Sequence, residues 1–441
     1  MSNIIKEPFG KLPEDLVYID VGSNIDFLTG PTFDSTKFNT EELGTRLSRG
    51  INITRGKMRW GKNNTQYWND DISSLEKYQL TKNDLVIGMD GSLVGRNYAL
   101  VTKEDLPCLL VQRVARLRNN NSLDIRYLYY AIASDYWLNY VDVVKTNSGI
   151  PHISNGDIKN FSIPKHSIKN QKKIAKILTN IDQLIKNTQE LIDKHTSIKQ
   201  GMMTDLFTRG IDLTTGQLRP SIEQAPHLYK ETELGWVPRD WDIKTINDLA
   251  VRVGSGVTPT GGSEIYKSEG VMFLRSQNII FDSLKLDDVA YIDDSIHESM
   301  ISSEVFAYDV LINITGASIG RCCCLPNGLG PVNTNQHVCA IRFSKPKKED
   351  SIYLSKVLAS YIGQNQIYTL NAGGNREGLN YQQLRSFLIP WPKNSKEIDA
   401  ITERLVSIDL KIDKNVDAVN KYTLLKKGLM QDLLTGKVAV S

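Results

Sequence analysis

The sequence has few cysteines and no long run of apolar residues. Five cysteines occur among 441 residues, and three of them, Cys322–Cys324, are consecutive. Consecutive cysteines lack the spacing of zinc ligands, so we expect reduced, buried thiols, as is usual in a cytosolic protein. The N-terminal MSNIIKEPFG is too polar for a signal peptide, and no apolar run approaches the roughly 20 residues of a membrane-spanning helix. The sequence therefore predicts a cytoplasmic protein without a membrane partner.

A strong net charge and catalytic motifs are also lacking. The 53 Lys and Arg residues nearly balance the 50 Asp and Glu residues, and a net charge of +3 neither favours nor excludes nucleic acid, which binds a local basic face. The chain has no amino-methyltransferase motif, no Gly-rich turn in a βαβ context, no P-loop and no His-Glu-x-x-His, and its six histidines are scattered. We expect no catalytic site, no bound metal and no bound cofactor in this chain.

Two long segments of the chain carry the same helical pattern. From about Lys169 to Leu206, apolar residues are spaced by four, three, four and seven, as in a coiled-coil seam. The pattern returns, shifted by 227 residues, from about Ser395 to Leu434. The seam positions are Ile174, Leu178, Ile181, Ile185, Thr188 and Ile192 in the first segment, and Ile401, Leu405, Ile408, Ile412, Asn415 and Val419 in the second. Each helix could simply cover its own domain, but a seam sustained over several heptads favours pairing of the two helices.

Thr188 and Asn415 are the polar residues nearest the middle of the two seams. If two copies of one unit pair in antiparallel fashion, a pseudo-twofold axis relates them, and equivalent residues near mid-helix meet at that axis. A polar residue in a seam costs stability but fixes the register. We therefore predict that Thr188 and Asn415 lie close together.

The segments that precede the helices are also repeated. Residues 84–96 (DLVIGMDGSLVGR) and 309–321 (DVLINITGASIGR) are identical at five of thirteen positions, where unrelated segments would share about one. The predicted fold is α+β, with two similar mixed α/β domains separated by two long antiparallel coiled-coil helices and a pseudo-twofold internal repeat. The predicted parts are a first domain (1–165), a central helix (166–208), a linker (209–230), a second domain (231–392) and a C-terminal helix (393–441). Two similar units at a fixed separation suit a two-part DNA site.

Several further segments resemble one protein family. They are Thr232–Trp241 (TELGWVPRDW), Thr208–Asp212 (TRGID) with Gly216–Pro220 (GQLRP), and the tail Leu429–Lys437 (LMQDLLTGK). Together they resemble the specificity (S) subunit of type I restriction–modification systems, and the resemblance covers nearly the whole chain. The first domain departs from the pattern, because it opens with KLPEDL and lacks the tryptophan.

The resemblance implies a function that spacing alone does not show. Each domain is expected to be a target-recognition domain that reads one half of a bipartite, asymmetric double-stranded DNA target. The helices are expected to set the spacer between the halves and to dock two modification (methyltransferase) subunits, which carry S-adenosylmethionine and methylate adenine. Two restriction subunits would complete an assembly that cleaves DNA with ATP and Mg. This chain would be the noncatalytic specificity subunit.

Residues shared by both domains cannot explain half-sites that differ, so they are expected to stabilise the fold or to contact phosphates. The shared candidates are the arginines Arg49, Arg275, Arg96 and Arg321 and the amides Asn52, Asn278, Gln112 and Gln336. The alternative for each arginine is a structural ion pair. The amides either contact bases or cap turns.

Stretches that differ between the domains are expected to read bases. They are residues 54–68 and 145–154 in the first domain, and 258–266 and 371–376 in the second. Arginine pairs well with guanine, and Asn or Gln with adenine. The candidates are Arg55, Arg59, Asn63, Asn64 and His152 in the first domain, and Asn375 and Arg376 in the second. The alternative for each is an ordinary solvated loop.

Two alternative functions belong to other classes of protein. An assembly scaffold would hold methyltransferase subunits and gain DNA affinity only in their presence. A metal-dependent nuclease would cleave DNA by itself, but the chain lacks paired acidic motifs. Specific DNA binding by the isolated chain would favour a specificity subunit over both.

Overall fold

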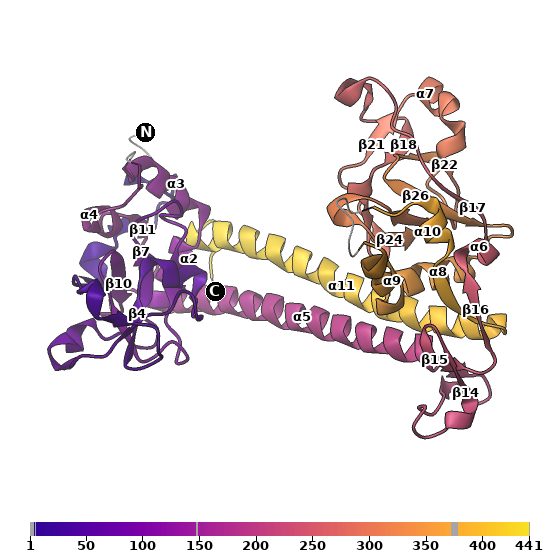
Figure 1. Cartoon of the computed structure of the whole chain (residues 1–441). Helices are drawn as coiled ribbons and strands as arrows, with labels where there is room; N and C mark the ends of the chain where they lie inside the picture. The colour runs from indigo at the N-terminus through magenta and orange to yellow at the C-terminus, as the bar shows by residue number, and fades with distance from the viewer. Residues whose placement is uncertain (1–3, 5, 147–148, 372–377, 441) are drawn as a thin grey trace. The chain divides into compact units, whose positions relative to one another are not determined.

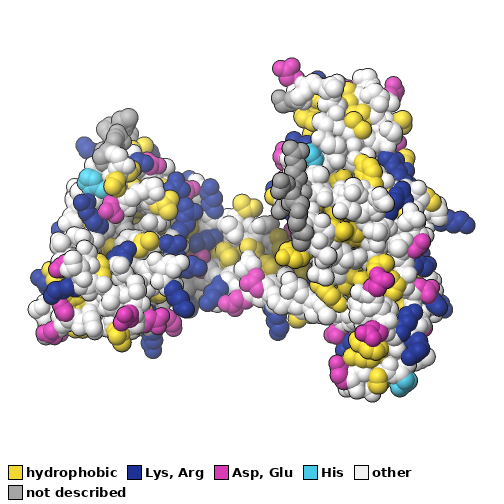
Figure 2. All heavy atoms as spheres, viewed as in Figure 1, with side chains coloured by type: hydrophobic (Ala, Val, Ile, Leu, Met, Phe, Trp, Pro, Cys, Tyr) yellow, Lys and Arg dark blue, Asp and Glu magenta, His cyan; other side chains and the backbone are white. Residues whose placement is uncertain are grey.

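The computed structural model describes residues 4, 6–146, 149–371 and 378–440 (Figure 1). The chain divides into two compact units: the first comprises Met1–Gln189 with Asp417–Ser441, and the second comprises Glu190–Val416. Each unit contains an α+β body and parts of both long helices. On the face drawn in Figure 2, Lys and Arg side chains are interspersed with Asp and Glu side chains, in keeping with the net charge of +3.

Two sheets form the body of the first unit, with strand orders β2-β10-β7-β8-β5 and β3-β6-β4-β9. The strands are β1 Tyr18–Asp20, β2 Asp26–Thr29, β3 Phe38–Asn39, β4 Thr45–Ser48, β5 Ile53–Met58, β6 Tyr67–Trp68, β7 Leu85–Gly88, β8 Tyr98–Leu100, β9 Cys108–Leu110, β10 Val114–Arg118 and β11 Ser162–Pro164, of which β1 pairs with β11. The apolar run of β7 is buried on both faces. Leu85 and Ile87 join one core cluster, and Val86 joins another.

Three helices of the first unit follow the sheets: α2 Ile125–Ile132, α3 Asp135–Val144 and α4 Asn155–Lys159. Helix α2 begins after Asp124, whose carboxylate accepts hydrogen bonds from the backbone N–H groups of Arg126 and Tyr127, both at 3.0 Å. The Tyr127 hydroxyl donates to the carbonyl of Pro164 at 2.8 Å. These bonds fix α2 against β11 within the largest core of this unit.

The second unit repeats this plan. Its two four-stranded sheets have the orders β17-β26-β23-β24 and β21-β18-β25-β22. The strands are β16 Trp241–Thr245, β17 Ala250–Ser255, β18 Val271–Leu274, β19 Ile279–Ile280, β20 Ser283–Leu284, β21 Ala290–Ile292, β22 Glu304–Val305, β23 Val310–Asn313, β24 Cys322–Cys324, β25 Val332–Thr334, β26 Val338–Phe343 and β27 Leu388–Pro392; the helices are α6 Ile246–Leu249, α7 Asp294–Ser299, α8 Lys348–Ala359, α9 Tyr361–Asn371 and α10 Tyr381–Arg385. The Tyr353 hydroxyl donates to the carbonyl of Pro390 at 2.7 Å, as Tyr127 does to Pro164 in the first unit.

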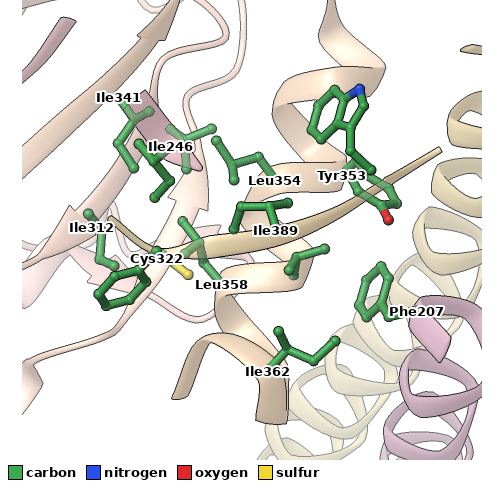
Figure 3. Packing of buried hydrophobic residues seen from close by; sticks show 14 of the residues in the cluster. Phe207, Ile246, Ile312, Cys322, Ile341, Tyr353, Leu354, Leu358, Ile362 and Ile389 are labelled. Atoms are coloured by element: carbon green, nitrogen blue, oxygen red, sulfur yellow. The ribbon is translucent and has the colours of Figure 1, made fainter. Parts of the chain in front are cut away.

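The core of the second unit lies between the strands, α8 and the end of the first long helix. Figure 3 shows Ile312 and Cys322 on neighbouring strands, with Leu358 of α8 and, farther along, Phe207. All five cysteines are free thiols, and four of them are buried. The fifth, Cys324, is half-buried, and burial raises its pKa to about 12. The expectation of buried thiols is therefore confirmed for four of the five cysteines.

The predicted linker is anchored to the second unit. It contains the strand pair β12 Ile211–Asp212 with β13 Gln217–Leu218, and it ends in β14 Tyr229–Thr232, which pairs with β15 Gly235–Pro238 at the start of the predicted second domain. Buried Glu397 accepts hydrogen bonds from the Ile211 N–H at 2.8 Å and from the Trp241 indole at 3.1 Å, and it pairs with Arg219. A buried carboxylate needs such partners, so the linker is an ordered part of this unit.

The two predicted long helices are α5 Ile168–Thr208 and α11 Ser395–Leu434. They run antiparallel in each unit. In the first unit, Asp182 pairs with Lys426 at 2.6 Å, while His166, just before α5, lies 3.1 Å from the carbonyl oxygen of Leu434. In the second unit, Lys199 pairs with Asp409 at 2.5 Å. The predicted seam residues are buried near the domains (Ile174, Leu178, Ile181, Ile401, Leu405 and Ile408) and half-buried elsewhere (Ile185, Thr188, Ile192, Ile412, Asn415 and Val419). The predicted fold class is confirmed.

The partner that we predicted for Asn415 is wrong. Its amide Nδ2 lies 3.3 Å from Nδ1 of His195, which is one heptad beyond Thr188 along α5. The Thr188 hydroxyl instead donates to the carbonyl of Leu184 in its own helix, at 2.7 Å. Ion pairs such as Lys199 with Asp409 set the helix register, so the polar seam positions need not coincide with the centre of the repeat.

Candidate nucleic-acid interface

Four loops of the first unit meet around a cleft of about 600 Å³. They follow β2, enter β5, follow β7, and connect β9 to β10. Three of them adjoin the largely buried strands β4, β7, β9 and β10, and the fourth follows β2, which pairs with β10, so the sheets fix their positions. The polar lining includes Arg49, Arg59, Gln112, Arg113 and Asp90. Three of these five were selected from the sequence, and the cleft brings them together.

The cleft has more basic groups than acidic ones. Burial lowers the pKa of Arg49, whose guanidinium donates to Oε1 of Gln66. Arg59 is exposed and donates to the carbonyl of Ile51 at 3.1 Å. Arg113 is 62% exposed, with its Nε 3.9 Å from a carboxylate oxygen of Asp90. Three guanidinium groups against one carboxylate favour an anionic ligand such as a nucleic-acid backbone.

The amides of Asn52 and Asn278 build the loop beside this cleft and its repeat. Asn52 is fully buried, accepts a hydrogen bond from the Arg49 N–H at 3.2 Å, and donates to the carbonyls of Arg59 (3.2 Å) and Asn64 (3.0 Å). Asn278 accepts from the Arg275 N–H at 3.0 Å and donates to two carbonyls in the same way. Both amide hydrogens are used within the loop, which favours the turn-capping alternative over base contact.

The corresponding loops of the second unit also meet. The Thr258 hydroxyl, in the loop after β17, donates to the side-chain oxygen of Gln336. The Thr315 hydroxyl, after β23, lies 2.6 Å from Nδ1 of His337. Asn313 donates to the carbonyl of Ser276 at 2.8 Å. The same four-loop arrangement therefore occurs twice, with different side chains at its surface.

The four shared arginines differ in their surroundings. Arg275 lies 3.7 Å from Asp288 and stacks over Tyr266, so the structural ion-pair alternative is favoured there. Arg96 is exposed and Arg321 is half-buried. Each follows a glycine with a left-handed φ, +80° at residue 95 and +83° at residue 320. A Cβ at residue 95 would lie 2.7 Å from Val141, so the loop packs closely against α3.

Other sequence-selected residues lie outside the cleft lining. Arg55 is exposed on β5, and Asn63 is exposed in the following loop. Asn64 is half-buried. Nδ1 of His152 lies 2.9 Å from the Thr146 hydroxyl, and the His152 backbone bridges to Asp90 at the cleft. Asn375 and Arg376 lie outside the described residues.

Arg113 and His337 were missed as candidates. They follow the shared glutamines, Gln112 and Gln336, and differ between the two domains. They form a single divergent position between shared residues, whereas the base-reading candidates from the sequence lie in longer divergent stretches. Asp90 lies beside Arg113 and Thr315 lies beside His337, and these two neighbours are also different residue types at equivalent positions.

The described part of the chain shows neither a metal centre nor a membrane span. Among the described residues, no group of three or more His, Cys, Asp or Glu side chains is placed to hold a metal ion. No described helix is long and apolar enough to cross a membrane.

Known proteins resemble this chain in sequence and in fold. Residues 42–194 and 238–419 match the family described as Type I restriction modification DNA specificity domain. The chain is 26% identical over 385 residues to the type I restriction enzyme MjaVIII specificity subunit of Methanocaldococcus jannaschii. The aligned residues make up 85% of this chain and 85% of that subunit. It is 35% identical over 189 residues to the EcoAI specificity subunit of Escherichia coli, covering 42% of this chain and 31% of that one.

A solved structure has the same fold. The type I restriction–modification S subunit of M. genitalium aligns with a TM-score of 0.61 at 16% identity, over 98% of this chain and 100% of that one. The first family region includes three of the four loops of the first unit and part of α5, and the second includes the equivalent loops of the second unit and part of α11. The chain therefore belongs to the type I restriction modification DNA specificity domain family and is a type I restriction–modification specificity subunit.

Proposed function

We propose that each unit carries one target-recognition domain and that each domain reads one half of a bipartite DNA target. The observation that carries this proposal is the four-loop arrangement, which occurs once per unit with different polar side chains. Loops held by a buried sheet present side chains at fixed positions, as recognition of base edges requires. Similar frameworks with different surfaces suit two half-sites that differ in sequence. The chain would bind DNA without catalysing a reaction.

The long helices would set the spacer between the half-sites. Helix α5 has 41 residues, which corresponds to a length of about 60 Å at 1.5 Å per residue. Half-sites on one face of DNA are separated by about 34 Å or a multiple of it. Ion pairs join α5 to α11 in both units, Asp182 with Lys426 and Lys199 with Asp409, and these hold the register of the helix pair.

The same helices would dock two methyltransferase subunits. Leu184, Leu191 and Ile198 recur on α5 at heptad spacing and are 44%, 45% and 42% exposed. On α11, Leu424 is 72% exposed. Apolar side chains at a regular helical spacing suit a helical partner. S-adenosylmethionine would be carried by these subunits, and ATP and Mg by the restriction subunits, with no cofactor on this chain.

Binding of the assembled complex to DNA tests the proposed recognition. The chain with its methyltransferase subunits is expected to prefer one two-part sequence over scrambled DNA. Replacing Arg59 with Ala should reduce the slope of log affinity against log salt by about 0.9 if Arg59 contacts a phosphate. Arg126→Ala, on the exposed side of α2, is the charge-matched control. Equal binding to all sequences would contradict the proposal.

A scaffold function is the second candidate, because the exposed apolar residues of α5 suit a protein partner. Under that alternative the chain binds DNA only when methyltransferase subunits are present. Leu191→Ala should weaken assembly, whereas Lys194→Ala, on the same helix, should not. Specific DNA binding by the isolated chain would remove the scaffold alternative.

A further inference from the structure

Arg113 and His337 occupy equivalent backbone positions in the two domains. Each follows a shared glutamine and precedes a central strand, β10 or β26. The carbonyl of Arg113 accepts a hydrogen bond from the N–H of Met89 at 3.0 Å, and that of His337 accepts from the N–H of Ile314 at 3.0 Å. The same backbone bond therefore supports both residues. The two domains differ here in the side chain and in the backbone φ, which is left-handed at Arg113 only.

The frameworks around the two positions are also equivalent. Gly30 packs against Val111, just before Arg113, and Gly256 packs against Thr334, just before His337. A Cβ at residue 30 would lie 2.2 Å from Val111, and a Cβ at residue 256 would lie 1.8 Å from Thr334. Only glycine permits that approach of two backbones. Glycine is therefore required at the same point of both loops, and a shared residue cannot account for a difference between two half-sites.

Each of the two side chains lies beside a polar residue that differs between the domains. Nε of Arg113 lies 3.9 Å from Oδ2 of Asp90, whereas Nδ1 of His337 lies 2.6 Å from the Thr315 hydroxyl. Asp90 and Thr315 are themselves equivalent, because they follow Met89 and Ile314. A guanidinium beside a carboxylate in one domain is thus replaced by an imidazole beside a hydroxyl in the other.

Arg113 presents its guanidinium to solvent at the cleft. Its side chain is 62% exposed, and within the described part of the chain no residue hydrogen-bonds to its Nη1 or Nη2. Its φ of +66° is left-handed, an uncommon conformation for a residue other than glycine, and such strain is concentrated at functional sites. Two terminal donors in a plane match O6 and N7 of guanine in the major groove.

His337 presents less to a base. The ring is half-buried and its Nδ1 is engaged by Thr315, which leaves Nε2 as the other polar atom of the ring. A single polar atom makes one hydrogen bond, so it discriminates between bases less than a bidentate arginine does.

We infer that Arg113 and His337 are equivalent specificity-determining residues: Arg113, oriented by Asp90, reads a guanine in one half-site, and His337 makes a single contact in the other. This inference rests on the proposed function, because it names the residue that reads one base pair. Asp90 is a positioning residue, since it acts through Arg113.

The methylation motif of the assembled complex tests the inference. Single-molecule sequencing of DNA from cells that express the chain with its methyltransferase subunit gives the motif. Arg113→Ala and Arg113→Lys should both lose the preference for a G·C pair at one position of one half-site, with a loss of discrimination of about 10- to 100-fold. Lysine keeps the charge but lacks the planar pair of donors, so it should retain affinity while losing the preference. Arg126→Ala should leave the motif unchanged.

The reciprocal variant extends the test to the second domain. His337→Arg combined with Thr315→Asp, which supplies the orienting carboxylate, should create a new G·C preference in the other half-site and leave the first half and the gap unchanged. A motif that survives Arg113→Lys intact, or a uniform loss of methylation on all sequences, would overturn the inference. Failure of the proposed function is a different result, because the wild-type complex would then show no bipartite motif at all. Thermal unfolding of each variant separates loss of recognition from loss of folding.

Discussion

Lys199 of α5 and Asp409 of α11 form an ion pair of 2.5 Å, and each also pairs with a residue of the second domain. Lys199 lies 2.5 Å from Asp282, in the turn between β19 and β20, and Asp409 pairs with Lys356 of α8. Lys356 and Asp282 complete the network at 2.8 Å. All four side chains are largely buried, so alternating charges fix the domain to both helices.

The first unit has a simpler version of this network. Asp182 pairs with Lys426 at 2.6 Å and accepts a hydrogen bond from the Tyr130 hydroxyl at 2.8 Å. Lys426 also lies over the Tyr130 ring, at 5.7 Å from its centroid. Tyr130 contacts the α5 aspartate of the first unit as Lys356 contacts the α11 aspartate of the second unit. The neutral hydroxyl of Tyr130 thus stands where the second unit has the ammonium group of Lys356.

Removing Lys356 should destabilise the second unit. Lys356→Ala leaves Asp282 and Asp409 sharing a single lysine, and breaking a buried pair in this way costs about 3–5 kcal/mol. Urea unfolding of the chain measures the loss. Lys393→Ala, which removes an exposed pair with Asp242, is the control and should cost no more than about 1 kcal/mol. Equal effects of the two substitutions would contradict a structural role for the network.

The network should also make stability depend on pH at the acidic end. Burial alone would raise the pKa of Asp282, but Lys356 and Lys199 outweigh it and hold that pKa below its usual 3.8. A lowered folded-state pKa contributes stability above pH 3.8, and this contribution is lost as the pH falls through the folded-state value. The difference in unfolding free energy between the wild type and Asp282→Asn should therefore shrink below about pH 3.8. A difference that grows as the pH falls would contradict this sign.

The capping amides should affect folding rather than base preference. Asn52→Ala and Asn278→Ala each leave buried backbone groups of one loop without a partner, which costs about 1–3 kcal/mol per group. Asn63→Ala, at an exposed position, is the control and should have little effect on stability. Denaturant unfolding gives the stability, and the methylation motif gives the specificity. A changed motif with unchanged stability would show that these amides read bases after all.

The loop after β7 should tolerate a side chain at Gly91 better than at Gly95. Both have a left-handed φ, +94° and +80°, so alanine is strained at each by about 1 kcal/mol. At Gly95 the new Cβ would also lie 2.7 Å from Val141, whereas at Gly91 nothing lies within 4 Å. Gly95→Ala should therefore lower the thermal midpoint more than Gly91→Ala. The opposite order would contradict the close packing of this loop against α3.

Parts of this structure that follow a local repeat could be predicted from the sequence. The seam from Ile174 to Ile192 predicts a paired helix because heptad spacing places its apolar residues on one face. The matching strand and loop at residues 84–96 and 309–321 predict two similar domains, because the shared glycines stand at the same spacing in both stretches and permit the same turns. Both features depend on residues that are close together in the chain, so they can be recognised in a single sequence.

Contacts between distant residues could not be predicted in this way. Lys356 and Asp282 are far apart in the sequence, and neither stands in a motif that marks a buried ion pair. The partner of Asn415 depends on the helix register, which those long-range pairs help to set. Arg113 could have been found, because it differs from His337 within a repeated stretch, but its conformation and its contact with Asp90 required the structure.

The methylation motif of the complex, before and after exchange of the first domain, is the most direct test of the central claim. Cells would express this chain with its methyltransferase subunit, and single-molecule sequencing would give the methylated adenines. We predict a two-part motif with a fixed gap, of which exchange of residues 1–165 for those of another specificity subunit alters one half only. A motif without a gap, or an exchange that alters both halves, would contradict the claim that each domain reads its own half-site.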